Sequence, residues 1–166
     1  MVKFKYILVA ALVVIIGIVV VRDLSQSDER RVRTQFDRLS EWVSKESGES
    51  VFTTSHKMKS IATLFADPCE FKADVISFTG SYTPEEVSRF TAQGRFYFSE
   101  LSLKFYDLKI DFIEEGRANV TLTATLKGRT KGGEDVDATH EVVSLLTKVD
   151  DQWLFSQFEV IEVLKK

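Results

Sequence analysis

The sequence predicts an α+β domain, in which three N-terminal helices pack on a four-stranded antiparallel sheet and one transmembrane helix precedes them. Three observations lead to this prediction. Residues 6–21 form an unbroken apolar run, apolar residues recur at helical spacing over much of residues 29–98, and apolar and polar residues alternate from residue 101 onward. The change of period from about 3.6 to 2 marks the change from helices to strands.

The apolar run carries no charge, and Lys3, Lys5 and Arg22 flank it. As a helix it would span about 24 Å, close to the hydrocarbon core of a bilayer at about 30 Å. A cleaved leader needs small residues just before its cutting site, and residues 18–24 offer none. We therefore expect residues 1–22 to be a membrane anchor, residues 23–28 a linker and residues 29–166 the folded domain. A cleaved leader and a buried core helix are the alternatives.

The charges suggest where the folded domain lies. Two lysines stand on the short N-terminal side of the run, which favours a cytoplasmic N-terminus. We expect a single-pass protein of a bacterial inner membrane, with its C-terminal domain in the periplasm. The chain has 25 acidic and 22 basic residues and a net charge of −3, which argues against a nucleic-acid partner. Cys69 is the only cysteine, so no internal disulfide forms, and we expect it to be buried and inert.

The helices are predicted from spacing and capping residues. Apolar residues on one stripe predict a first helix from about residue 29 to 46, and a second follows over about residues 54–66. The second helix should end before Pro68, because Asp67 precedes a proline. "TPEE" predicts the start of a third helix, which should run to about residue 98. Thr83 is its cap, Pro84 takes the first helical position and Glu86 completes a capping box.

Strands follow from alternation. Two short apolar pieces, residues 69–73 and 75–79, lie between the second and third helices. Four longer alternating stretches come after the third helix, joined by "EEGR", by "KGRTKGGED" and by a tight turn at Asp150–Asp151. Consecutive strands joined in this way predict an antiparallel meander with one packed and one polar face.

Three stretches, "IATLFADPCEF", "TPEEVSRF" and "VDDQWLFSQF", resemble the nuclear transport factor 2-like superfamily, also called the cystatin-like cone fold. The resemblance covers about residues 28–164 and implies a curved sheet that forms a cone around its interior. The superfamily includes ketosteroid isomerases, scytalone-type dehydratases, inert ligand binders and assembly modules. Its membrane-anchored members occur in type IV secretion systems and in envelope transport systems. The resemblance therefore also implies envelope proteins as partners.

The resemblance does not bring a complete catalytic set. The isomerases use a tyrosine on the first helix and an acid on the third long strand, and this chain has neither there. Their base would correspond approximately to Asp74. His140 is the remaining candidate, as a general base with Asp67, Asp74 or Glu141, or as a structural strand residue. The two histidines do not have the spacing of metal ligands, so we expect no metal site, and the sequence contains no cofactor-binding motif. Alternation predicts a ligand pocket lined by Tyr106, Leu108, Phe112, Leu122, His140 and Phe155.

Three functional hypotheses remain, and the first is that the chain is a non-enzymatic interaction or assembly module, anchored in the cell envelope. The second is a binder of a small hydrophobic ligand, and the third a lyase or isomerase that uses His140. A homodimer is expected through the threonine-rich face of residues 121–125. The arginines of "RRVRTQFDR" fit either contact with anionic head groups or a solvated helix face, because acids interrupt them.

Overall fold

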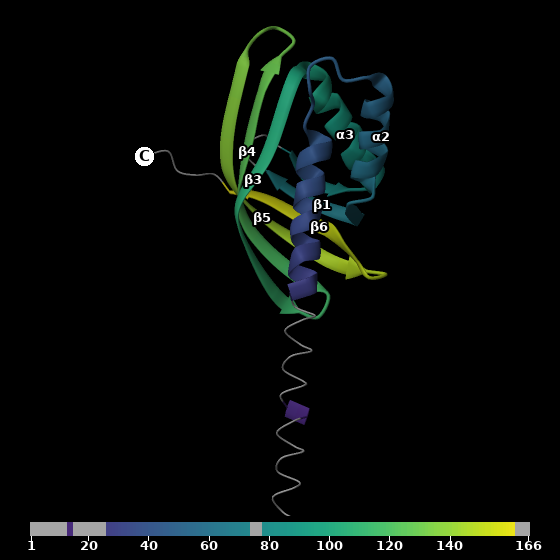
Figure 1. The fold of residues 1–166 in the computed structure, drawn as a ribbon, viewed down its shortest axis with the longest axis vertical. Helices are drawn as coiled ribbons and strands as arrows, with labels where there is room; N and C mark the ends of the chain where they lie inside the picture. The colour runs from purple at the N-terminus through teal and green to yellow at the C-terminus, as the bar shows by residue number, and fades with distance from the viewer. Residues whose placement is uncertain (1–12, 15–25, 74–77, 162–166) are drawn as a thin grey trace, which may run out of the picture.

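The structure is a computed structural model that describes residues 13–14, 26–73 and 78–161. It confirms an α+β fold with helices first and long strands afterwards (Figure 1). The expected anchor lies outside the described residues except for Val13 and Val14. Among the described residues, no helix is long and apolar enough to cross a membrane. The elements are a helix of residues 26–43, α2 (Val51–Ala62), β1 (Phe65–Ala73), β2 (Phe78–Tyr82), α3 (Pro84–Tyr97), β3 (Phe98–Glu114), β4 (Arg117–Thr130), β5 (Asp135–Val149) and β6 (Gln152–Ile161).

The strands form one six-stranded sheet in the order β2-β1-β6-β5-β4-β3. The expectation of a four-stranded sheet was therefore wrong. β1 pairs in parallel with β6, and β2 pairs antiparallel with β1, so the two short strands extend the meander. The pairing of β1 with β6 joins segments far apart in the chain, for example Lys72 with Glu159. Local sequence patterns contain no sign of such a distant pairing.

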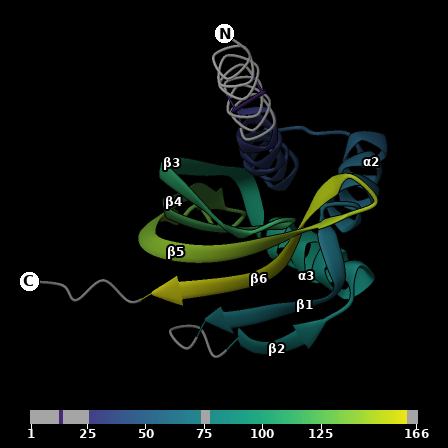
Figure 2. The same cartoon turned by 90° about the horizontal axis from the view of Figure 1, so that it is seen from below.

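The sheet curves, and its concave face packs against the helices (Figure 2). The helix of residues 26–43 buries Val32, Phe36 and Leu39, as the spacing predicted. It ends three residues earlier than expected, because the chain turns to pair with the start of β3. There, Lys45 and Leu101 exchange both backbone hydrogen bonds, at 2.7 and 2.9 Å.

The other two helices test the capping predictions. The box at α3 is confirmed: the Glu86 amide donates to Thr83 Oγ1 at 3.3 Å, and the Thr83 amide donates to Glu86 Oε2 at 2.9 Å. The bounds of α2 were predicted too late in the chain. Ser50 caps this helix through the amide of Thr53, and the helix ends at Ala62. Asp67 and the cis Asp67–Pro68 peptide lie inside β1 and not at a helix end.

A bulge in β3 changes which residues face the core. Asp107 has a φ of 57°, and the pairing of β3 with β4 shifts between Tyr106 and Lys109. Phe105 and Leu108 therefore both pack against the core, and Tyr106 is 48% exposed. The expectation that Tyr106 lines the interior was wrong, because strict alternation does not survive a bulge.

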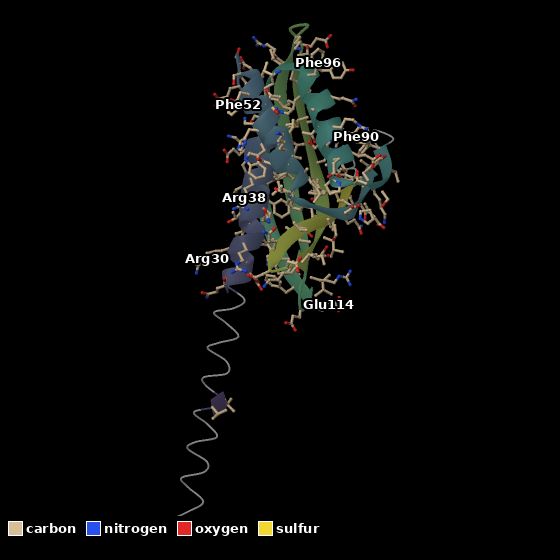
Figure 3. All side chains as sticks on the ribbon, turned by 90° about the vertical axis from the view of Figure 1, so that its right-hand side faces the viewer. Arg30, Arg38, Phe52, Phe90, Phe96 and Glu114 are labelled. Carbon is tan, nitrogen blue, oxygen red and sulfur yellow. The ribbon has the colours of Figure 1, made fainter. Side chains whose placement is uncertain are left out.

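Exposed aromatic residues lie at the end of the molecule away from residue 26. Phe52 is 84% exposed and Phe96 67% exposed, and Figure 3 places both near that end. The ring of Phe96 lies under the ammonium group of Lys131, at 3.5 Å from the ring centroid.

A buried ionic cluster joins the helices at that end. The Glu49 carboxylate, 4% exposed, lies 2.7 Å from Lys57 Nζ and 2.7 Å from Arg95 Nη2. Arg95 also donates to the carbonyl oxygens of Val43 and Ser44, where the helix of residues 26–43 ends. This cluster ties the loop of residues 44–50 to both α2 and α3. The Nη1 atom of Arg95 is buried without a hydrogen-bond partner.

Candidate functional site

The concave face of the sheet is where the cone fold would hold a ligand, and aromatic rings occupy it. Successive ring centroids lie 4.9 to 5.6 Å apart along one path, so each ring touches the next. The path crosses the face from α3 to β3 through Phe90, Phe78, Phe71, Phe158, Phe155, Phe36 and Phe105.

Several of these rings were missed by the sequence analysis. Phe158 is the clearest case, because alternation from Phe155 would place it on the outer face. A bulge in β6 at Ser156 reverses the alternation, since Leu146 pairs with Phe155 and Leu145 with Gln157. Phe155 and Phe158 therefore both point inward and their rings lie 4.9 Å apart. The only signal in the sequence was the count of 13 phenylalanines, which does not say where they meet.

His140 lies on the same face, next to this aromatic path. It pairs with Ala124 of β4, and Ala124 also pairs with Phe105 of β3, so the three residues form one row across the sheet. The imidazole is partly exposed, but its Nδ1 atom is buried and has no hydrogen-bond partner among the residues that the structure describes. An unpaired ring nitrogen in an apolar setting is a hydrogen-bonding position that a ligand or a water can use.

The carboxylates proposed as partners of His140 are not brought to it among the described residues. Asp67 is exposed in β1. Glu141 is exposed, and as the next residue along the strand it belongs to the opposite face. Asp74 lies outside the described residues, so its role stays a prediction. A lone imidazole can accept or donate a proton, but elimination or isomerisation also needs a group that stabilises the developing charge.

The other predicted pocket residues have mixed placements. Leu122 and Phe155 are buried, with 2% and 0% of their surface exposed, and Leu108 packs against the same core. Phe112 is 37% exposed at the edge, with its ring 5.8 Å from that of Trp153. Tyr106 lies on the other face. Leu122, Phe155 and Leu108 therefore belong to the packed core, and whether any of the predicted residues touches a ligand stays a prediction.

Cys69 is the other potentially reactive side chain near this core. It is fully buried, as expected. Burial raises the pKa of its thiol to about 12, with a smaller contribution from the negative charge of Glu70. At neutral pH the thiolate needed for nucleophilic chemistry is therefore scarce. Within residues 26–73 and 78–161, no group of three or more His, Cys, Asp or Glu side chains is placed to hold a metal ion.

Comparisons with known proteins identify the fold. No protein family and no curated protein matches the sequence. A Novosphingobium aromaticivorans protein named as a candidate scytalone dehydratase superposes with a TM-score of 0.71 at 19% identity, over 86% of this chain and 88% of that one. A type-3 hexachlorocyclohexane dehydrochlorinase of Novosphingobium barchaimii gives 0.65 at 15% identity, over 84% and 89%. A variant of a Mycobacterium tuberculosis protein of unknown function gives 0.66 at 13% identity, over 84% and 73%.

These likenesses cover most of the chain, and they include proteins named for elimination reactions as well as one without a known function. At such low identity they show the fold and do not carry an activity across. The chain therefore has the cone fold of the nuclear transport factor 2-like proteins.

Proposed function

We propose that this chain is a non-enzymatic interaction or assembly module of the bacterial envelope. In this proposal residues 1–22 hold it at the inner membrane, and the cone domain lies on the periplasmic side and acts through its outer surfaces. The observation that carries the non-enzymatic part is the unbroken path of ring contacts across the concave face. Side chains of the protein itself take the space in which a substrate would have to lie.

A truncation of one ring tests whether this face is packed or open. Phe155→Ala should cost about 3 kcal/mol of unfolding free energy or more, because this ring is fully buried and its loss leaves a cavity in a packed interior. If the ring instead lined an open ligand cavity, the loss would be well under that figure. Phe96→Ala is the matched control, because the ring of Phe96 is 67% exposed. Urea unfolding of the full chain in dodecyl maltoside, followed by tryptophan fluorescence, gives both values.

The tether is supported by the apolar run of residues 6–21 and by the lysines in front of it. The full chain should sediment with membranes and should be released by detergent but not by carbonate. Its intact mass should include residues 1–22. A soluble species that begins near Asp23 would contradict the tether and leave the proposal for the cone intact.

A homodimer through the outer face of the sheet is part of this proposal. Thr121, Thr123 and Thr125 are half-buried on the side of β4 away from the core, and Thr125 lies 3.1 Å from Thr139 of β5 through their hydroxyl groups. This uncharged strip would suit a flat contact between two sheets. Thr123→Arg should convert a dimer to a monomer in light scattering, and Ser55→Arg on α2 should not. A monomeric wild type at high concentration would rule the dimer out.

A lyase that uses His140 is the second candidate. The unpartnered, buried Nδ1 atom on the concave face favours it, because a substrate group could complete that hydrogen bond. His140→Ala in the chromosomal copy should reproduce the phenotype of a deletion if the chain is a lyase, and should leave the cell as wild type if our first proposal holds. His56→Ala is the matched control, since His56 is exposed on α2.

A further inference from the structure

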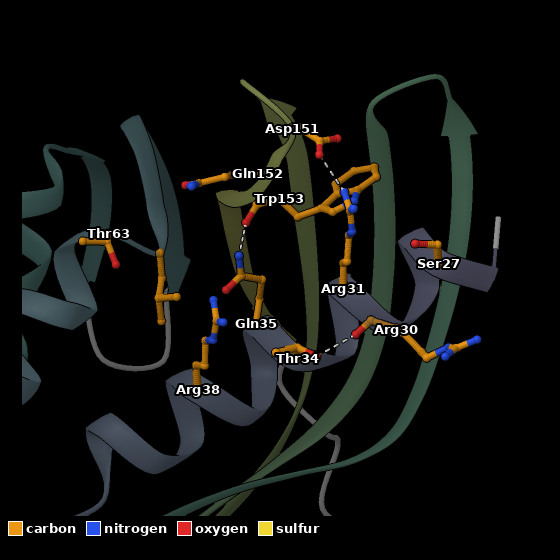
Figure 4. Close-up of a pocket in the computed structure, with 11 residues that line it drawn as sticks. Ser27, Arg30, Arg31, Thr34, Gln35, Arg38, Thr63, Asp151, Gln152 and Trp153 are labelled. Atoms are coloured by element: carbon orange, nitrogen blue, oxygen red, sulfur yellow. Dashed lines mark hydrogen bonds and ion pairs between the residues drawn. The ribbon is translucent and has the colours of Figure 1, made fainter. Parts of the chain in front are cut away.

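A cleft of about 640 Å³ lies outside the cone, beside the helix of residues 26–43. That helix forms one wall, Thr63 and Leu64 form the second, and the turn from β5 to β6 forms the third (Figure 4). Neither the proposed function nor the site around His140 involves this cleft.

The wall formed by the helix is cationic. Arg30, Arg31 and Arg38 line the cleft, since residues seven or eight apart return to the same side of a helix. Arg31 is neutralised by Asp151, at 3.0 Å. The guanidinium groups of Arg30 and Arg38 are exposed and have no ion-pair partner in the part of the chain that the structure describes.

The acids of this segment, Asp28, Glu29 and Asp37, do not line the cleft. Asp28 accepts hydrogen bonds from Lys148 Nζ at 3.1 Å and from Trp153 Nε1 at 3.2 Å. Glu29 accepts from Arg33 at 2.9 Å, on another side of the helix. The cleft therefore keeps a surplus of two positive charges on a chain whose net charge is −3.

A buried acceptor faces the same space. Gln35 is only 8% exposed, and its Nε2 atom donates to the Trp153 carbonyl oxygen at 2.5 Å. This contact fixes the orientation of the amide and leaves Oε1 buried, with no hydrogen-bond partner in the described ranges. Figure 4 shows Oε1 turned into the space beside Arg38. A buried oxygen in this state lowers stability until a donor reaches it.

The two observations together define a ligand chemistry. Guanidinium groups bind phosphate oxygens with two parallel hydrogen bonds. Arg38, which lies beside the Gln35 oxygen, suits such a phosphate group, and Arg30 adds positive charge at the other end of the cleft (Figure 4). With the phosphate held by Arg38, a hydroxyl group elsewhere on the same ligand would donate to the Gln35 oxygen. We propose that this cleft binds a phosphate ester that carries a free hydroxyl group, of the glycerol phosphate kind.

Such a group has two sources, a soluble metabolite or a phospholipid head group. Ser27 lines the cleft only six residues after the apolar run ends at residue 21, a distance of at most about 20 Å along the chain. If residues 1–22 span a membrane, the head groups lie within reach of the cleft. Only this second source depends on the proposed tether.

The test measures binding of sn-glycerol 3-phosphate to the full chain in dodecyl maltoside by calorimetry. The wild type should bind it, and Arg30→Gln with Arg38→Gln should weaken binding by about tenfold or more. Arg33→Gln with Arg89→Gln is the control, because it removes the same charge from arginines that pair with Glu29 and Glu86 outside the cleft. No binding by the wild type, or equal losses in the two double variants, would overturn the proposal.

Two further measurements sharpen the ligand class. Gln35→Met, checked for folding by its melting temperature, should remove the preference for glycerol phosphate over inorganic phosphate, and a retained preference would refute the role of Oε1. The affinity for glycerol 3-phosphate should also be measured in nanodiscs of phosphatidylglycerol. The control nanodiscs contain phosphatidylcholine and enough oleate to carry the same negative charge. If phosphatidylglycerol head groups occupy the cleft, they compete with glycerol 3-phosphate and its affinity is lower than in the control. Equal affinities would assign the cleft to a soluble ester.

Discussion

Two groups of cationic side chains flank the helix of residues 26–43, and they differ in what neutralises them. At its C-terminal end, Arg95 and Lys57 share the buried carboxylate of Glu49, at 2.7 Å each. Along its earlier turns, Arg30 and Arg38 line an open cleft and contact no carboxylate of residues 26–73 and 78–161. The first group has its counter-ion inside the folded protein, and this cluster stabilises the protein. The second group lacks a counter-ion among the described residues, so its arginines are available to bind an anionic ligand.

The difference also appears in the pKa of the acid. Burial would raise the pKa of the Glu49 carboxyl, but hydrogen bonds from Lys57, Arg95 and Thr54 outweigh it and hold the pKa at about 2. Arg95 adds two bonds to the carbonyls at the end of the helix, where positive charge is favourable. The closed cluster is thus a structural device. Removing the charge of Glu49 tests this structural role directly.

Glu49→Gln should cause the largest loss of stability, about 3–5 kcal/mol, because it leaves buried cations without their counter-ion. Urea unfolding of the full chain in detergent measures the loss. Glu46→Gln is the matched control, since Glu46 is exposed in the same loop, and it should change stability by no more than about 0.5 kcal/mol. A loss below about 1 kcal/mol in Glu49→Gln would show that the cluster is not structural.

Acid should weaken the same cluster. The folded pKa of Glu49 is about 2 against an ordinary value of 4.5, so the charged cluster contributes fully above pH 4.5 and loses its contribution as the pH falls toward 2. A shift of this size corresponds to about 3 kcal/mol. Unfolding free energies measured between pH 6 and pH 2 should fall by about that amount more in the wild type than in Glu49→Gln. Parallel curves for the two proteins would contradict the assignment.

The arginines of the cleft should behave in the opposite way. Arg30→Gln with Arg38→Gln should change the unfolding free energy by no more than about 0.5 kcal/mol, because neither guanidinium forms an ion pair within the part of the chain that the structure describes. The double variant should be slightly more stable than the wild type at low salt, where like charges repel, and equal to it at high salt. A loss of more than about 1 kcal/mol would place these arginines with the structural cluster and remove the basis of the proposed site.

Features that depend on neighbouring residues could be predicted from the sequence. The box between Thr83 and Glu86 and the stripe of Val32, Phe36 and Leu39 are of this kind, because both depend on short, regular spacings. The fold class followed from the order of such elements. Strand pairing over long separations, as between β1 and β6, depends on the whole chain and was missed.

The sites were less predictable than the fold. Two bulges, at Asp107 and Ser156, reversed the alternation on which the pocket prediction rested. As a result, Tyr106 lies on the outer face of the sheet and Phe158 lies on the concave face. In the arginine segment, Asp28 appeared in the sequence as a neutralising neighbour, but it binds Lys148 and Trp153 instead, more than 100 residues away. The charge surplus of the cleft therefore became visible only in three dimensions.

The smallest expected effect concerns Asp151, the one acid among the described residues that lines the cleft. It lies 3.0 Å from Arg31 and 3.1 Å from Lys148, and hydrogen bonds from Lys148 and Arg31 lower its pKa. Its negative charge opposes an incoming phosphate. Asp151→Asn removes the charge and keeps the shape, and asparagine tolerates the φ of 62° at this position.

Asp151→Asn should therefore raise the affinity for glycerol 3-phosphate by about two- to threefold, as expected for removing one charge at a solvent-exposed distance. The gain should shrink as salt is added, because exposed charges are screened. Asp150→Asn is the matched control, since Asp150 has a φ of 47° in the same turn and makes no contact with Arg31. A lower affinity in Asp151→Asn alone would mean that Asp151 holds Arg31 in position for the ligand, and the cleft would then resemble the Glu49 cluster in using an acid to organise its cations.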